Sequence, residues 1–243
     1  MKKNNKEFSM HGIPTPEARS FFEKARNLCE IKQFDEALHF LDEALKSYPY
    51  YVNVWNLKGV VLCKLGKPKK ALECFDRAID LKSKYTKAWN NKGQAFIKLG
   101  KLMEALECFN FVLNFKRDNK TSWKNKGRVL AELGKCDEAL ECFNMVLTLR
   151  QNYAQIWEKK VDILLKQNKI EEVKSCLNNA KRILSKDIDV VLNKSDLLYE
   201  MGKTEELIEC INTALKLNPN DINLLEKKEE MLNKLDKTKI LTF

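Results

Sequence analysis

Five cysteines recur at intervals of 34 residues along the chain: Cys74, Cys108, Cys142, Cys176 and Cys210. Thiols at a regular spacing could form disulfides or bind a metal ion such as zinc. Zinc needs several ligands that converge on one point. The sequence contains no CxxC or HExxH motif, and His11 and His39 are its only histidines. We therefore expect neither a metal site nor a cofactor.

A second recurring set consists of lysines at the same 34-residue interval: Lys58, Lys92, Lys126, Lys160 and Lys194. Five ammonium groups at equal intervals could follow the phosphate backbone of a nucleic acid. Alternatively, the aliphatic stems could cover apolar surface while the charged ends reach water. We favour the second interpretation, and the first stays open.

The elements that position these residues are revealed by an internal repeat. The four tryptophans are also 34 residues apart: Trp55, Trp89, Trp123 and Trp157. Within one period, Trp55, Gly59 and Leu62 have the i, i+4, i+7 spacing that places residues on one face of a helix. Ala71, Phe75 and Ala78 repeat that spacing further along. Each period therefore predicts two amphipathic helices that pack against each other.

The unit from 52 to 85 resembles a tetratricopeptide repeat, a helix-turn-helix motif of this length. The resemblance rests on the residues just named and extends in register over six units. These are residues 18–51, 52–85, 86–119, 120–153, 154–187 and 188–221. It implies an all-α fold, a right-handed solenoid of six helix pairs. Residues 1–17 are expected to be an N-terminal tail, and residues 222–243 a C-terminal capping helix with its tail.

Local signals place the ends of several helices. Thr15-Pro16-Glu17 reads as an N-cap followed by proline and an acidic residue at a helix start. Gly66, Gly100 and Gly134 stand between the two helices of their units, where glycine can adopt the left-handed conformation that ends a helix. Asn168 occupies the same place in the fifth unit.

The resemblance also implies a function, because the first helices of such repeats line a concave groove that holds peptide segments of partner proteins. The candidate groove residues are mostly basic or amide side chains: Asn56, Lys87, Asn90, Asn91, Gln94, Lys98, Lys124, Asn125, Arg128 and Lys159. Amide side chains can donate to and accept from a peptide backbone. We therefore expect a protein-interaction scaffold whose partner is an acidic protein or peptide.

The formal net charge of +10 suggests a different class of partner, namely RNA or another polyanion. The excess of lysine over arginine weakens this alternative, because arginine supplies most specific contacts to nucleic acids. Aromatic residues suited to base stacking are also missing from the expected groove. Nucleic-acid binding stays the second hypothesis.

Other classes of protein are not favoured. There is no glycine-rich phosphate loop or nucleophile elbow, and the repeats occupy nearly the whole chain, so we expect no enzyme. The sequence shows neither a signal peptide nor a membrane-spanning stretch, which predicts a cytoplasmic protein with reduced thiols. The polar capping helix favours a monomer.

Overall fold

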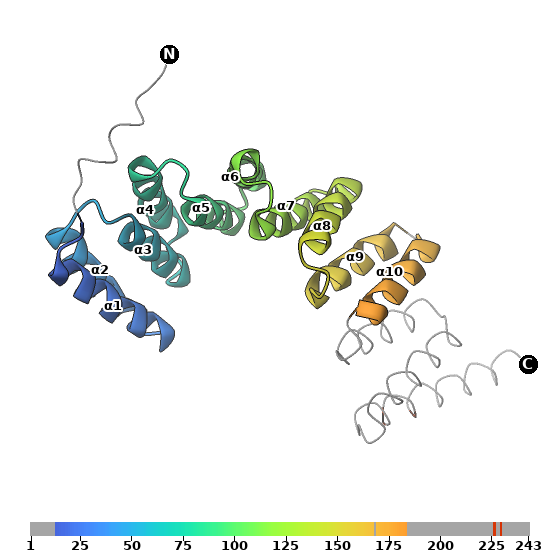
Figure 1. Ribbon diagram of the computed structural model, residues 1–243, viewed down its shortest axis with the longest axis horizontal. Helices are drawn as coiled ribbons and strands as arrows, with labels where there is room; N and C mark the ends of the chain where they lie inside the picture. The colour runs from blue at the N-terminus through green and yellow to red at the C-terminus, as the bar shows by residue number, and fades with distance from the viewer. Residues whose placement is uncertain (1–12, 168, 184–225, 227–228, 230–243) are drawn as a thin grey trace, which may run out of the picture. The chain divides into compact units, whose positions relative to one another are not determined.

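The computed structural model describes residues 13–167, 169–183, 226 and 229. Its regular elements within that part are ten α-helices (Figure 1). Their bounds are α1 Pro16–Glu30, α2 Phe34–Ser47, α3 Val52–Lys64, α4 Pro68–Leu81, α5 Thr86–Lys98, α6 Leu102–Phe115, α7 Lys120–Glu132, α8 Cys136–Leu149, α9 Ala154–Lys166 and α10 Ile170–Ile183. The sixth predicted repeat lies outside the described residues, and so does the predicted capping segment 222–243 apart from residues 226 and 229.

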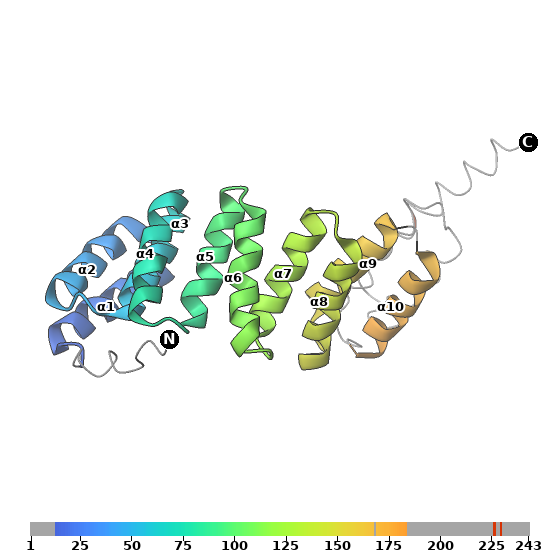
Figure 2. The ribbon, with the colours of Figure 1, turned by 90° about the horizontal axis from the view of Figure 1, so that it is seen from above.

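The helices pack in consecutive pairs. Helix α1 contacts α2, α3 contacts α4, α5 contacts α6, and α9 contacts α10. Each of the first three pairs also contacts the next helix along the chain, so that α4 to α7 lie side by side in chain order (Figure 2). The chain divides into two compact units between Cys142 and Phe143, inside α8. The prediction of an all-α array of helix pairs is therefore confirmed, whereas the division into six repeats stays a prediction.

The predicted helix ends are confirmed where the structure describes them. The Thr15 hydroxyl oxygen accepts a hydrogen bond from the Ala18 amide at 3.1 Å, and Pro16 begins α1. Gly66, Gly100 and Gly134 have φ angles of 73°, 72° and 76°. In the first repeat Lys32 takes this conformation with φ 62°, which the sequence pattern did not reveal. Asn168 lies outside the described residues.

The recurring glycine of the first helix allows the second helix to pack closely. A Cβ atom added to Gly59 would lie 2.5 Å from Cε1 of Phe75, and one added to Gly93 would lie 2.5 Å from Cε1 of Phe109. Both phenylalanines are fully buried. Any larger side chain at these glycines would have to displace an aromatic ring from the core.

Each recurring tryptophan joins its helix to the connection before it. The indole N–H donates to a backbone carbonyl six residues earlier, as in Trp55 to Pro49 at 2.7 Å and Trp89 to Ser83 at 2.8 Å. Trp123 and Trp157 make the equivalent bonds to Arg117 and Gln151. The sequence predicted that these tryptophans lie on the helix face that packs against the second helix of the repeat. Only the structure showed that they also hold the preceding loop by a hydrogen bond.

Candidate functional site

The first helices of successive repeats form one continuous surface in the first unit. Helix α3 contacts α5, and α5 contacts α7 (Figure 1). We use the term first-helix face for the candidate residues that these three helices leave wholly or partly accessible: Asn56, Lys87, Asn91, Gln94, Lys98, Lys124 and Arg128. The structure thus brings seven of the ten predicted site residues onto neighbouring helices.

The first-helix face is almost free of acidic residues. Helices α3 and α5 contain no Asp or Glu, and α7 contains one, Glu132, as its last residue. Lys87, Lys98 and Arg128 are exposed there. A surface of one charge sign attracts ligands of the opposite sign and raises their association rate.

Hydrogen bonds between repeats fix part of this face. The Asn91 amide donates to Oδ1 of Asn56 at 2.9 Å, which joins α5 to α3. The Lys98 ammonium donates to the backbone carbonyl of Cys63 at 2.8 Å. Both bonds connect neighbouring repeats and hold polar groups in a fixed arrangement before a ligand arrives.

Two predicted groove residues are buried instead. Asn90 is only 7% exposed and Asn125 only 4%. The Ser122 hydroxyl donates to Oδ1 of Asn90 at 2.9 Å, and the Asn90 amide donates to the Thr86 carbonyl at 3.1 Å. Asn90 therefore belongs to the contact between α5 and α7. Its expected place on an open groove was wrong, because the start of α7 packs over this side of α5.

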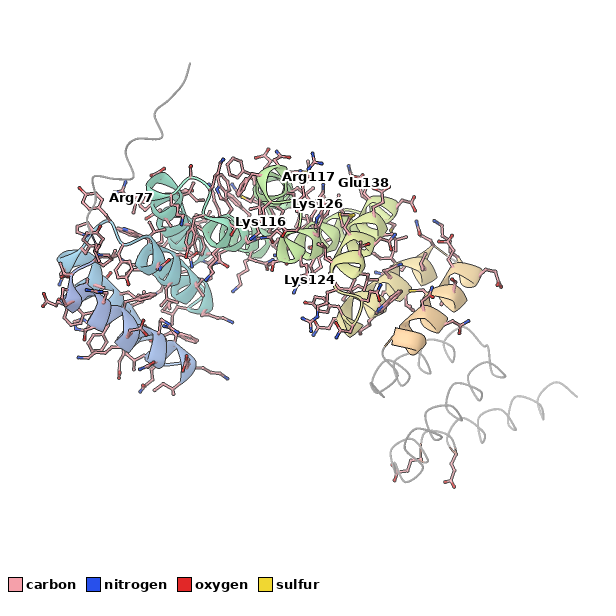
Figure 3. The ribbon with its side chains drawn as sticks, in the orientation of Figure 1. Arg77, Lys116, Arg117, Lys124, Lys126 and Glu138 are labelled. Atoms are coloured by element: carbon pink, nitrogen blue, oxygen red, sulfur yellow. The ribbon has the colours of Figure 1, made fainter. Side chains whose placement is uncertain are left out.

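The remaining predicted residues lie at different places. Gln94 and Lys124 are half-buried, and Figure 3 shows Lys124 projecting from the opposite side of α7 to Lys126. Lys159 lies in the second unit, where its ammonium is 3.1 Å from Asp162 on the same helix. Lys159 therefore belongs to a different unit from the seven residues of the first-helix face.

Apolar residues accompany the polar ones and were not among the predicted site residues. Leu57, Val60 and Ile97 are half-buried on α3 and α5. Leu57 and Val60 occupy the same repeat positions as predicted polar residues, namely those of Asn91 and Gln94, so the 34-residue period could have identified them. They would give an amphipathic peptide an apolar contact beside the basic groups.

The lysine row, which we define as Lys58, Lys92, Lys126 and Lys160 in the described part, lies against the tryptophans. Each Nζ is between 5.2 and 5.6 Å from the centroid of the indole ring in its own helix, a cation–π geometry. Lys58 pairs with Asp42 at 2.5 Å, and Lys92 pairs with Asp76 at 2.6 Å. The aspartates are themselves 34 residues apart, so the sequence held a signal for these ion pairs. Lys194 lies outside the described residues.

The recurring cysteines are buried and resist ionisation. Cys74, Cys108, Cys142 and Cys176 are each at most 5% exposed, as predicted for small core side chains. Burial raises the pKa of Cys74 and of Cys142 to about 11, and that of Cys108 to about 12. Because nucleophilic attack requires the thiolate, these thiols are poor nucleophiles at neutral pH. Cys210 lies outside the described residues.

Two further features are absent from the described residues, namely a cluster of metal ligands and a membrane-spanning helix. No cluster of three or more His, Cys, Asp or Glu there could hold a metal ion. No helix in the same part of the chain combines the length and apolar character needed to cross a membrane.

Comparison with known proteins identifies the repeat. Two tetratricopeptide repeat models match, one at residues 52–85 and 86–119 and the other at residues 188–221. No curated protein matches the chain.

Solved structures share its fold at low sequence identity. Pseudomonas aeruginosa pilF has 17% identity and a TM-score of 0.67 over 88% of this chain and 97% of its own. A tetratricopeptide repeat protein from Parabacteroides merdae has 16% identity and a TM-score of 0.66 over 89% and 90%. YrrB, a TPR protein with an unusual peptide-binding site, has 18% identity and a TM-score of 0.55 over 78% and 97%.

Proposed function

The chain is a tetratricopeptide repeat protein, and we propose that it is a protein-interaction scaffold whose first-helix face binds an acidic peptide segment of a partner protein. The repeat fold generally serves protein–protein interaction. The peptide-binding site of the structural neighbour YrrB supports the same use of the fold here.

One observation carries this proposal, namely the charge of the first-helix face. Three adjacent helices present Lys87, Lys98 and Arg128 without an acidic residue except Glu132 at one end. The amides of Asn56 and Asn91 lie among these cations and are already hydrogen-bonded to each other. Amide pairs of this kind can accept and donate bonds along a peptide backbone, while the cations attract carboxylates.

The alternative of polyanion binding along the lysine row receives less support. A phosphate backbone needs accessible cations, yet the ammonium groups of Lys58 and Lys92 are already paired with aspartates. Their side chains are only 23% and 19% exposed. At least two lysines of the row are therefore not available to bind successive phosphates.

The test is a capture experiment from lysate of the source organism, with and without nuclease, read by mass spectrometry. The informative variant combines Lys87→Glu, Lys124→Glu and Arg128→Glu, which reverses the charge of the first-helix face without touching the buried Asn125. Proteins that the wild-type chain captures after nuclease treatment, and that this variant does not capture, are the expected result.

A charge-matched control combines Lys67→Glu, Lys69→Glu and Lys70→Glu around the start of α4. These lysines are exposed, and acidic residues near a helix N-terminus are favourable for its dipole. The control should capture the same proteins as the wild type. Equal capture by both triple variants, or capture that nuclease abolishes, would contradict the proposal.

A further inference from the structure

The lysine row contains two kinds of environment. Lys58 and Lys92 each reach back to an aspartate on the second helix of the preceding repeat, Asp42 on α2 and Asp76 on α4. The equivalent position in the next repeat, 34 residues after Asp76, holds an asparagine, Asn110 on α6. Helix α6 packs against α7, which carries Lys126, as α4 packs against α5. The residue equivalent to the aspartate partners of Lys58 and Lys92 is therefore an asparagine, which cannot form an ion pair with Lys126.

Lys126 keeps the rest of the arrangement. Its Nζ lies 5.4 Å from the centroid of the Trp123 ring, the same distance as for Lys92 and Trp89. In the described part of the first unit, Lys126 makes no ion pair with a carboxylate. Glu138, which like Lys126 contributes to the electrostatic environment of Cys142, is paired with Lys135 at 3.1 Å.

The second unit repeats the pattern independently. Lys160 lies 5.2 Å from the centroid of the Trp157 ring, and the residue equivalent to Asp76 is Asn144. Among the described residues of that unit, Lys160 makes no ion pair, and the nearby carboxylate of Asp162 pairs with Lys159. Two successive positions of the row therefore hold a half-buried lysine against an indole without the acid that accompanies Lys58 and Lys92.

We propose that Lys126 and Lys160 form two separate sites, each of which binds an Asp or Glu carboxylate from an acidic segment of a partner protein, and that neither site includes a residue of the first-helix face. The bound carboxylate pairs with each of these lysines as Asp42 and Asp76 pair with Lys58 and Lys92. The connection before α7 carries the exposed cations Lys116 and Arg117 beside the exposed Asp118. Figure 3 shows Lys126 and Arg117 on the same side of α7, opposite Lys124.

A carboxylate fits this site better than a nucleic acid does. Within the fold, Lys58 and Lys92 each pair with a single aspartate, so one acidic side chain is the matching partner for Lys126 and for Lys160. Single-stranded nucleic acids gain much of their affinity by stacking bases on exposed aromatic faces. At Trp123 and Trp157 a lysine already lies over the ring, and the indole N–H is already bonded to a loop carbonyl.

The four indole N–H groups provide the readout, because each tryptophan reports on its own lysine. We would record nitrogen-15 spectra of the full chain at low salt and add a short end-blocked peptide of alternating Asp and Glu. Single Trp→Phe variants assign the four indole signals. The Trp123 and Trp157 signals should shift with the peptide, whereas those of Trp55 and Trp89 should not.

Asn110→Asp gives the decisive variant, because it restores the missing acid from within the chain. In this variant the peptide should no longer shift the Trp123 signal but should still shift that of Trp157. Lys126→Gln should have the same effect, and Lys92→Gln should leave the Trp123 response intact. Thermal unfolding identifies any variant that has lost its fold.

Several results would overturn the inference. These are equal shifts of all four indole signals, a Trp123 shift that survives Asn110→Asp, or no shift of Trp123 at all. A shift of Trp123 by an oligouridine but not by the acidic peptide would assign the site to nucleic acid. Because none of these variants alters the first-helix face, their outcome is independent of the capture experiment above.

Discussion

Lys92 and Asp76 form an ion pair of 2.6 Å that joins the first helix of one repeat to the second helix of the repeat before it. The same ammonium lies over the ring of Trp89 on its own helix α5, so one side chain contacts both its own helix and the preceding helix α4. The Lys92 side chain is 19% exposed and that of Asp76 is 50% exposed. The pair is therefore partly screened by water, and its effect on stability should be measurable but small.

Comparison of Lys92→Met with Lys126→Met tests this contribution. Both substitutions remove a cation–π contact with a tryptophan, whereas Lys92→Met also removes a contact with the Phe96 ring and breaks an ion pair. Lys92→Met should lower the free energy of unfolding by about 0.5–1 kcal/mol more than Lys126→Met does. Urea denaturation at low salt measures the difference, and it should shrink at high salt. Identical losses for the two variants would show that the aspartate contributes nothing.

Asn110→Asp should raise stability, because it supplies an acid to Lys126. The expected gain in the free energy of unfolding is about 0.5 kcal/mol, typical of a partly exposed pair. Urea denaturation of the variant and of the double variant Asn110→Asp with Lys126→Met measures it. The gain should vanish in the Lys126→Met background, and a gain that persists there would have another origin.

Gly59→Ala should destabilise the second repeat, because the new Cβ would lie 2.5 Å from the Phe75 ring. Overpacking of this kind costs about 1–3 kcal/mol. Combining Gly59→Ala with Phe75→Leu should cost less than the sum of the two single substitutions, because the smaller side chain yields space. Additive losses in denaturant unfolding would show that the cost of Gly59→Ala does not come from the Phe75 ring.

Asn90→Ala and Asn91→Ala should separate stability from binding, although the two residues are adjacent. Asn90 is buried and bonded to Ser122, so its loss should cost about 1–3 kcal/mol of stability. Asn91 is half-buried on the first-helix face, so its loss should weaken partner capture with little effect on stability. Unfolding curves and the capture assay measure both quantities, and the reverse assignment would contradict the described orientation of α5.

Alkaline pH should destabilise the fold through Cys108. Burial raises the pKa of this thiol to about 12, whereas an unfolded cysteine ionises near about 8.5. The unfolded state therefore binds fewer protons between these values, and the free energy of unfolding should fall as pH rises above about 8.5. Urea denaturation from neutral to alkaline pH should show a smaller decline for Cys108→Ala than for the wild type. An unchanged slope would mean that the thiol ionises in the folded state.

Much of this architecture can be read from the sequence because it depends on local geometry. The recurrence of Trp, Gly, Ala and Phe determines where two helices begin and end and which stripes they bury. Helices end at Gly66, Gly100 and Gly134 because glycine adopts the left-handed conformation without steric cost, and this preference can be read from the single residue. The burial of the recurring cysteines, such as Cys74 and Cys108, follows from the same helical period.

The candidate site was only partly predictable, since it depends on how neighbouring repeats are rotated against each other. Asn90 and Asn91 are adjacent and chemically identical, yet α7 covers the first and leaves the second partly accessible. The ion pairs of Lys58 and Lys92 likewise arise from contact between repeats. The sequence by itself determined the repeating helix pairs, their caps and the basic charge of the first helices. Only the tertiary structure decided which polar groups are left to meet a partner, because that depends on packing between helices that no single repeat contains.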